Sequence, residues 1–440
     1  MPARRSILKA IRREGGATAV MSGATEPYMI PYALALGASA FEAGLLSSGR
    51  NLLVAILQLW SAELAAWLRS RRRLVLGTIA VQALLWLPIA FASSFGPYAV
   101  LALIACYTLG AAVAALGLPA WGSLMADFVP AERRGRFFGR RARAVGLYMT
   151  AAMLLAGLTL HGTARTPLIG FGLLCLVAAA SRAASWRAVQ RVPEQGDEAV
   201  AGRQFSFAEF LRVAPHSNFT RFSLTLGAFG FATHMASPFF AVYILEERGL
   251  GYLTYSLVIF TGTLVGAFGS AWWGRLGDRT GNHAVLRWAT VGVSGLPLLW
   301  LVAPNAVALG AVNATGAFLW SGINLAATNF LYDAVTPAKR HTCLAYFNVL
   351  HGVGVGLGAL TGGLLLHVLP GTSAANFAML FALSVALRVV AAFTLRRSVR
   401  EVRTVEPFVL RQFVLDLVGQ RLVAVLDALP GRGKRGRRDR

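Results

Sequence analysis

Charged side chains are scarce in this chain. Asp, Glu, Lys and Arg together make up 14% of its 440 residues, whereas soluble domains carry about 25%. Hydrophobic residues make up 56%, and the mean hydropathy is +0.58. Too little polar surface remains to cover a soluble fold of this length. The composition therefore excludes a soluble protein and indicates a membrane protein.

Cysteine is also scarce, and groups of catalytic residues are missing. The three cysteines, Cys106, Cys175 and Cys343, lie in or at the ends of apolar segments, and no pair has the spacing of a metal site. The sequence has no His or Cys cluster, no nucleophilic serine motif and no paired carboxylates within an apolar segment. We therefore expect the cysteines to be small core residues. We expect no cofactor, no metal and no enzymatic activity.

Acidic residues and lysine are few, so arginine dominates the charge. The net charge is +23, and the only lysines are Lys9, Lys339 and Lys434. The arginines recur in alternate loops, in the ranges 69–73, 133–143, 187–212, 275–287 and 339–340, and the intervening loops are short and almost uncharged. The positive-inside rule then predicts cytoplasmic termini. A nucleic-acid partner is not expected, because the arginines are spread over every inner loop.

Long apolar runs are what the chain has in abundance. Segments of about 20 residues are long enough to span the hydrocarbon core of a membrane. Twelve such segments begin near Ala17, Gly44, Leu74, Tyr98, Ala144, Pro167, Phe219, Leu253, Ala284, Ala306, Leu344 and Ala374. Because irregular backbone cannot face lipid, these segments must be helices. The sequence predicts an all-α membrane protein with twelve transmembrane helices.

Two halves of the chain repeat each other at one spacing. Pro31 and Pro238 are 207 residues apart, and so are Pro130 and Pro337, each within a similar short motif. We infer a duplicated unit: six-helix bundles at 17–189 and 218–397, with a cytoplasmic linker at 190–217. Cytoplasmic tails are expected at 1–16 and 398–440. In membrane proteins, parallel halves are typical of transporters with the site between the halves.

The strongest local motif covers residues 274–283, with the sequence GRLGDRTGNH. It lies in a predicted inner loop and resembles the loop signature Gly-x-x-x-Asp-Arg-x-Gly of the major facilitator superfamily. The resemblance implies the fold of that family, two pseudo-symmetric six-helix bundles, and transport by alternating access. It also implies that Gly274, Asp278, Arg279 and Gly281 hold the cytoplasmic side shut and release it.

The junction after the fourth apolar segment also resembles this superfamily. Asp127 and Arg133 lie there, and Asp333 and Arg340 repeat the pattern in the second half. Each aspartate is expected to pair with an arginine of a neighbouring inner loop, as part of a gate or as a plain positioning pair. The first-half loop at 62–73 keeps the arginines but lacks the Asp and the glycines of the signature.

Candidate cavity residues are the polar groups inside apolar segments. Glu26 lies close to the middle of the first segment, where an unpaired charge costs several kcal/mol, and His234 occupies the matching place in the seventh. The resemblance implies that the helices carrying them line a central cavity, where the two would face each other. Both side chains can exchange protons near neutral pH, so we expect proton coupling or solute contact. Weaker candidates are Asn324, Trp320 and Tyr107.

The expected partners are a small solute, protons and membrane lipids. The segment 408–429 has a broad apolar face and is followed by a polybasic end, a pattern suited to anionic headgroups of the inner leaflet. Abundant arginine and alanine are typical of a GC-rich bacterial genome, so we expect a bacterial cytoplasmic membrane. We also expect the protein to be a monomer.

The sequence therefore favours a secondary active transporter, with proton coupling through Glu26 as the working mechanism. A non-transporting membrane sensor or assembly factor on the same fold stays open, because the first-half loop has lost its signature. Multidrug efflux and uniport also stay open, and the substrate and direction cannot be derived from the sequence.

Overall fold

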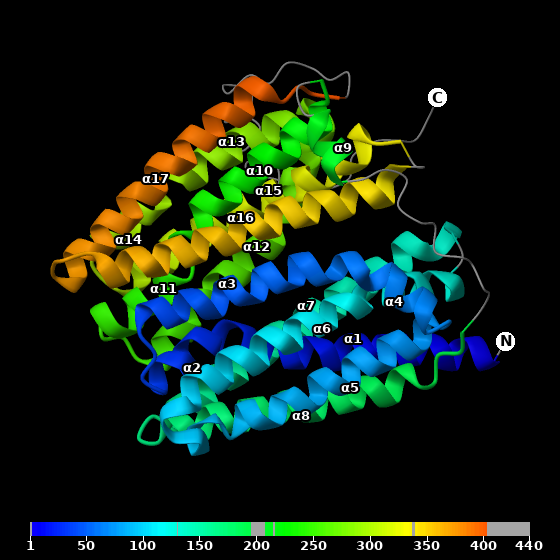
Figure 1. Ribbon diagram of the computed structural model, residues 1–440, viewed down its shortest axis with the longest axis horizontal. Coiled ribbons are helices and arrows are strands. Elements are labelled where there is room, and N and C mark those ends of the chain that lie inside the picture. The colour runs from blue at the N-terminus through cyan, green and yellow to red at the C-terminus, as the bar shows by residue number, and fades with distance from the viewer. Residues whose placement is uncertain (1, 130, 195–206, 214–215, 337–338, 403–440) are drawn as a thin grey trace, which may run out of the picture.

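The computed structural model describes residues 2–129, 131–194, 207–213, 216–336 and 339–402 (Figure 1). Within these ranges the regular elements are helices and none is a strand. Eleven helical segments are long and apolar enough to cross a membrane. The first helix is interrupted and begins with polar residues, so it is not among these eleven. Counted with them, it gives the predicted all-α fold of twelve helices.

The first half forms one bundle, drawn in blue to green in the lower part of Figure 1. Its helices are α1 (Pro2–Thr25), α2 (Met29–Ala35), α3 (Ala40–Leu57), α4 (Ser61–Trp67), α5 (Arg71–Ala90), α6 (Ala99–Phe128), α7 (Ala131–Gly162) and α8 (Pro167–Val189). Helix α1 begins well before the apolar segment at Ala17 and buries Ala10 and Ile11 against the bundle.

The second half repeats this arrangement above the first (Figure 1). Its helices are α9 (Phe207–Arg212), α10 (Asn218–His234), α11 (Phe239–Val242), α12 (Tyr252–Thr280), α13 (Asn282–Ser294), α14 (Leu296–Val302), α15 (Ala306–Ala334), α16 (Arg340–Val368) and α17 (Ser373–Ser398). The short helix α9 precedes the bundle and packs Phe210 against Phe219 and Tyr346.

The first helix of each half is broken at a matching place. A 3-10 turn at Glu26–Tyr28, which contains Pro27, separates α1 from α2. In the second half α10 ends at His234, and α11 begins after Pro238. Proline lacks an amide N–H and clashes with the preceding turn, so it interrupts each helix.

Helix α16 joins the two halves through glycine. A side chain at Gly354 or Gly358 would collide with carbonyl oxygens of α10 in its own half. On another face a Cβ at Gly352 would lie 2.5 Å from the Cβ of Ala55, and one at Gly356 would lie 2.4 Å from Leu52, both on α3 of the other half. Figure 1 shows α3 and α16 side by side. Glycine therefore permits close helix contact both within and between the halves.

Hydrogen bonds also cross between the halves, near the end of the bundle that carries the short loops. The Tyr28 hydroxyl lies 2.8 Å from the Ser256 Oγ, and the Tyr255 hydroxyl donates to the Pro27 carbonyl at 2.7 Å. The turn that interrupts the first helix thus takes part in holding the halves together at this end.

Candidate functional site

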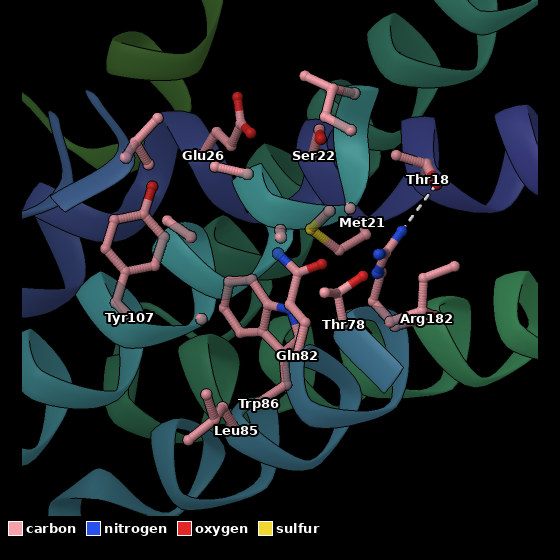
Figure 2. Close-up of a pocket in the computed structure, with 18 of the residues that line it drawn as sticks. Thr18, Met21, Ser22, Glu26, Thr78, Gln82, Leu85, Trp86, Tyr107 and Arg182 are labelled. Carbon is pink, nitrogen blue, oxygen red and sulfur yellow. Dashed lines mark hydrogen bonds between the residues drawn. The ribbon is translucent and has the colours of Figure 1, made fainter. Parts of the chain in front are cut away.

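A cavity of about 290 Å³ lies inside the first half, among α1, α3, α5, α6 and α8 (Figure 2). Its walls are mainly apolar and aromatic, with a few polar groups that converge on it. The polar and charged lining residues include Glu14, Thr18, Ser22, Glu26, Arg50, Thr78, Gln82, Tyr107 and Arg182, and the apolar ones include Met21, Val54, Ile79, Leu85, Trp86 and Trp121. Such a lining is typical of a small-molecule site.

One end of the cavity holds an ion pair at the break in the first helix. The Glu26 Oε1 lies 3.4 Å from the Arg50 Nη2, and these side chains are 39% and 37% exposed. The Arg50 guanidinium carbon lies 5.8 Å from the centre of the Tyr107 ring. A pair that is long and open to the cavity separates at little cost. The arrangement therefore allows the two side chains to part and face the cavity separately.

The other end of the cavity holds a buried carboxylate. Glu14 is 4% exposed, and its Oε2 lies 2.7 Å from the Arg141 Nη2. The Trp121 Nε1 donates to the same oxygen, and the Thr18 hydroxyl donates to Oε1. Because its charge is paired and hydrogen-bonded, Glu14 is held in place in the bundle. Sequence reasoning missed Glu14, because it precedes the apolar segment and was assigned to a tail.

Four buried polar atoms around the cavity have no hydrogen-bond partner among the described residues. They are the Arg50 Nε, the Trp86 Nε1, the Arg182 Nε and the Gln82 Oε1. Trp86 is 3% exposed, Arg182 6% and Gln82 9%. Buried polar atoms in native proteins almost always have partners. A cluster of unpaired ones around a cavity indicates that the cavity takes a polar occupant.

The predicted cavity residues fall into two groups. Glu26 and Tyr107 line the same cavity with Arg50 between them. His234 lies in the second half, where its Nδ1 is 3.2 Å from the Gly230 carbonyl. Trp320 and Asn324 also lie in the second half, on α15, and Trp320 packs on Phe229. Glu26 thus lines the first-half cavity, whereas His234 is not among the lining residues and is hydrogen-bonded within its own helix.

The second half has a buried arginine where the first half has Arg182. Arg388 lies 206 residues after Arg182, and both sit at the same distance from the start of the last helix of their half. Arg388 donates to the Ser384 hydroxyl and to the carbonyls of Val293 and Thr233. The two carbonyls lie in the last turns of α13 and α10, next to the helix breaks. All three nitrogens of Arg388 are thus used by the protein itself, unlike those of Arg182.

The expected gate aspartates have partners at the other end of the bundle, where α5 and α13 begin. Asp127 Oδ2 lies 2.9 Å from the Arg71 Nη2, and Asp333 accepts a hydrogen bond from the Asn282 Nδ2 at 2.9 Å. Arg71 and Asn282 are the first residues of matching helices, α5 and α13. Asp127 thus pairs with an arginine of a neighbouring loop, as expected. The side chains of Arg133 and Arg340 lie outside the described part of the structure.

The same two helices are capped by matching glutamates. The Glu194 carboxylate accepts hydrogen bonds from the Ser70 hydroxyl and the Arg71 amide at the start of α5. Glu401, 207 residues later, accepts one from the His283 amide in the first turn of α13. Burial tends to raise the pKa of Glu194, but these hydrogen bonds outweigh it and leave the pKa below its ordinary value.

The signature at 274–283 forms the end of α12 and the turn into α13. Gly281 has a φ of +88°, which a residue with a Cβ rarely adopts, and a Cβ on Gly274 would lie 3.5 Å from Leu325 of α15. Asp278 is exposed, with no hydrogen-bond partner among the described residues, and Arg279 is exposed beside it. In the first half the corresponding turn has Arg69 at a φ of +50°.

Two helix bundles joined through glycine, with broken first helices and an internal polar cavity, define a membrane transporter fold. The family model of the Major Facilitator Superfamily matches residues 15–331 and 229–426. The chain belongs to this superfamily. No curated protein sequence matches it significantly.

Solved structures of membrane transporters share the fold. A mutant of the nucleoside transporter NupG superposes with a TM-score of 0.69 at 13% identity, covering 90% of this chain and 100% of that one. A bacterial homologue of the iron transporter ferroportin in an inward-facing state has a TM-score of 0.69 at 15% identity, covering 89% and 98%. A D-xylose–proton symporter has 0.70 at 11% identity, covering 92% and 99%. Identities this low show a common fold alone.

Proposed function

We propose that this protein is a secondary active transporter that moves a small solute by alternating access, with protons coupled through Glu26. One observation carries the proposal: the Glu26 carboxylate lies in a cavity at a helix break, 3.4 Å from the Arg50 guanidinium. Membrane interiors disfavour unpaired charge. A proton that neutralises Glu26 therefore leaves Arg50 in need of another partner, which a solute can supply.

Alternating access requires the halves to separate at one end while they close at the other. The contacts of Tyr28 with Ser256 and of Tyr255 with Pro27 hold the short-loop end together. Two of these residues follow Glu26 directly in the chain. A change of partner at Glu26 is thus positioned to alter the helix break and the contacts that close this end.

The opposite end is proposed to carry the gate. It would be closed by a latch, which consists of Gly274, Asp278, Arg279 and Gly281. The Asp278 carboxylate has no partner among the described residues, which fits an arrangement in which this latch is released. Asp127 with Arg71, and Asp333 with Asn282, would fix the ends of the helices on which the latch closes. We place this end, with both termini, in the cytoplasm of a bacterial cell, as the arginine-rich loops favour. We also propose that the protein acts as a monomer.

The test is solute accumulation in proteoliposomes under an imposed pH gradient. With Glu26→Gln, which keeps the shape but cannot titrate, uphill accumulation and its pH dependence should disappear while exchange of solute across the membrane continues. Glu246→Gln removes an exposed carboxylate outside the cavity and should behave like the unchanged protein. Uphill accumulation by Glu26→Gln with an unchanged pH response would refute coupling through this residue.

The rival functions give different results in the same vesicles. A sensor or assembly factor would bind solute and give no flux. A uniporter would give flux that a proton gradient does not drive uphill. A multidrug exporter would move structurally unrelated cations out of loaded vesicles, a function that the guanidinium groups of Arg50 and Arg182 in this cavity do not favour.

A further inference from the structure

We infer that the cavity of the first half binds a small organic monocarboxylate with an apolar body, and that the Trp86 Nε1 and the Arg182 Nε donate hydrogen bonds to its carboxylate. This inference rests on the proposed function, since it names the class of solute that the transporter would carry. The two donor side chains, Trp86 and Arg182, come from α5 and α8, so the site belongs to the first half alone.

The unpaired atoms around the cavity are mostly donors. The Nε–H groups of Arg50 and Arg182 and the Nε1–H of Trp86 lack partners, whereas the only fully buried acceptor without a partner in the described lining is the Gln82 Oε1. An occupant that satisfies three donors and one acceptor must itself be rich in acceptors. A carboxylate offers two oxygens with about four lone-pair sites, and hydrogen bonds to an ionised group are about twice as strong as neutral ones.

The charges of the cavity also favour an anion. Arg50 and Arg182 face it with Glu14 and Glu26, and Glu14 is neutralised separately by Arg141. When Glu26 takes up a proton, Arg50 loses its carboxylate partner, and Glu14, which already pairs with Arg141, is the one carboxylate left among the lining residues to face two guanidinium groups. One bound carboxylate would then restore part of the balance at this depth, where uncompensated charge is costly.

The shape of the cavity restricts the rest of the molecule. A volume of about 290 Å³ holds on the order of ten non-hydrogen atoms, at about 30 Å³ for each water-sized group. Figure 2 shows Gln82 and Trp86 between Tyr107 on one side and Arg182 on the other. Leu85, Met21 and Trp86 give much of this wall an apolar character, which suits a ring or short branched chain. A hydroxyl on that body can donate to the Gln82 Oε1.

The second half supplies an internal comparison for Arg182. Arg388, at the matching position, donates its Nε to the Ser384 hydroxyl and its other nitrogens to backbone carbonyls. Arg182 instead has its Nη1 on the Thr18 hydroxyl and leaves its Nε unpaired beside the cavity. A buried arginine at this position can be fully satisfied by the fold. The unpaired Nε of Arg182 is therefore not forced by the position and points to a ligand.

Binding can be measured on the full chain in detergent by titration calorimetry, with no gradient present. We use 4-hydroxybenzoate as the probe and 4-hydroxybenzamide as its neutral counterpart of the same shape. The acid should bind at least tenfold more tightly than the amide. Equal binding of the two, or no binding of the acid, would overturn the inference.

Two variants and one control locate the binding. Trp86→Phe removes one N–H and little volume, and should weaken binding of the acid about tenfold while leaving the amide almost unaffected. Trp300→Phe, a matched change at a tryptophan that is also 3% exposed but lies in the second half, should leave binding unchanged. Arg182→Gln should abolish preference for the acid. Unchanged binding in Trp86→Phe would place the site elsewhere and overturn the assignment.

The two proposals fail in different ways. Binding of the acid without flux into vesicles would leave the anion site standing and would refute transport. Flux of a neutral solute with no binding of the acid would refute the anion site and leave transport standing.

Discussion

At the scale of single residues, the buried arginines are the feature of the sequence that marks the two halves at one more position. Arg182 and Arg388 each interrupt an apolar segment at nearly the same spacing as the other repeats. Glu26 and Tyr107 could be predicted as cavity residues because they are polar groups within apolar segments. The unpaired state of Gln82 and Trp86 could not, since it depends on how five helices pack around them.

Glu194 makes stability depend on pH in a defined direction. Its pKa is lowered below the ordinary value of 4.5, so its stabilising effect is complete above that value and is lost as the pH falls through the lowered pKa. At pH 7, Glu194→Gln should lower the melting temperature by about 1–2 °C, as expected for a weakened helix cap.

The measurement compares the melting temperatures of the two proteins in detergent from pH 7 to pH 3. The difference between them should shrink below pH 4.5 and vanish once Glu194 is protonated. Glu247→Gln, another glutamate outside the helix caps, should show no such pattern. A difference that stays constant down to pH 3 would mean that the cap does not depend on the ionised carboxylate.

At the scale of the helices, most of the fold follows from apolar length and proline. The apolar segments correspond to the observed spans, and Pro27 and Pro238 mark the breaks of the first helix in each half. The start of α1 at Pro2 could not be predicted, because its first turns are basic and polar. They are helical because Ala10 and Ile11 pack into the bundle, an effect of tertiary contact that hydropathy does not record.

The prediction for the latch concerns Asp278, near the end of α12. Asp278 lies outside the cavity and is exposed, so Asp278→Asn should slow transport about tenfold, a change of about 1.4 kcal/mol in the barrier, without changing solute affinity. Initial rates in proteoliposomes and calorimetric binding together measure both effects.

Gly146→Ala is a suitable control on another helix near the same end, because a Cβ there meets no atom within 4 Å. It should leave both rate and affinity unchanged. If Asp278→Asn transports at the full rate, the Asp278 carboxylate has no part in the gate of this protein.

At the scale of the whole molecule, the duplication predicted two similar bundles but not their difference. The repeats at 207 residues match the paired helix breaks and the paired caps of Glu194 and Glu401. No sequence repeat predicts the cavity, which lies in the first half. The halves also differ at the buried arginines, because Arg388 is satisfied by carbonyls next to helix breaks, whereas the Arg182 Nε has no partner among the described residues.

The orientation of the molecule is testable by cysteine labelling. In a background without Cys106, Cys175 and Cys343, single cysteines at Ser94 and Thr372, both in short loops, should react with an impermeant maleimide in intact cells. Cysteines at Arg72 and Arg212 should react only after permeabilisation, because the arginine-rich loops stay inside. The reverse pattern at any two positions would contradict the proposed topology.

The two buried arginines also bear on how such a protein can change over evolutionary time. Arg388 holds carbonyls in two broken helices, so mutations around it damage the fold before they can create a new specificity. The Nε of Arg182 has no partner in the fold, so the residues around it can change without breaking a hydrogen bond to that atom. We therefore expect descendants of this protein to acquire new substrates through changes in α1, α5 and α8. The second half of the chain should change more slowly.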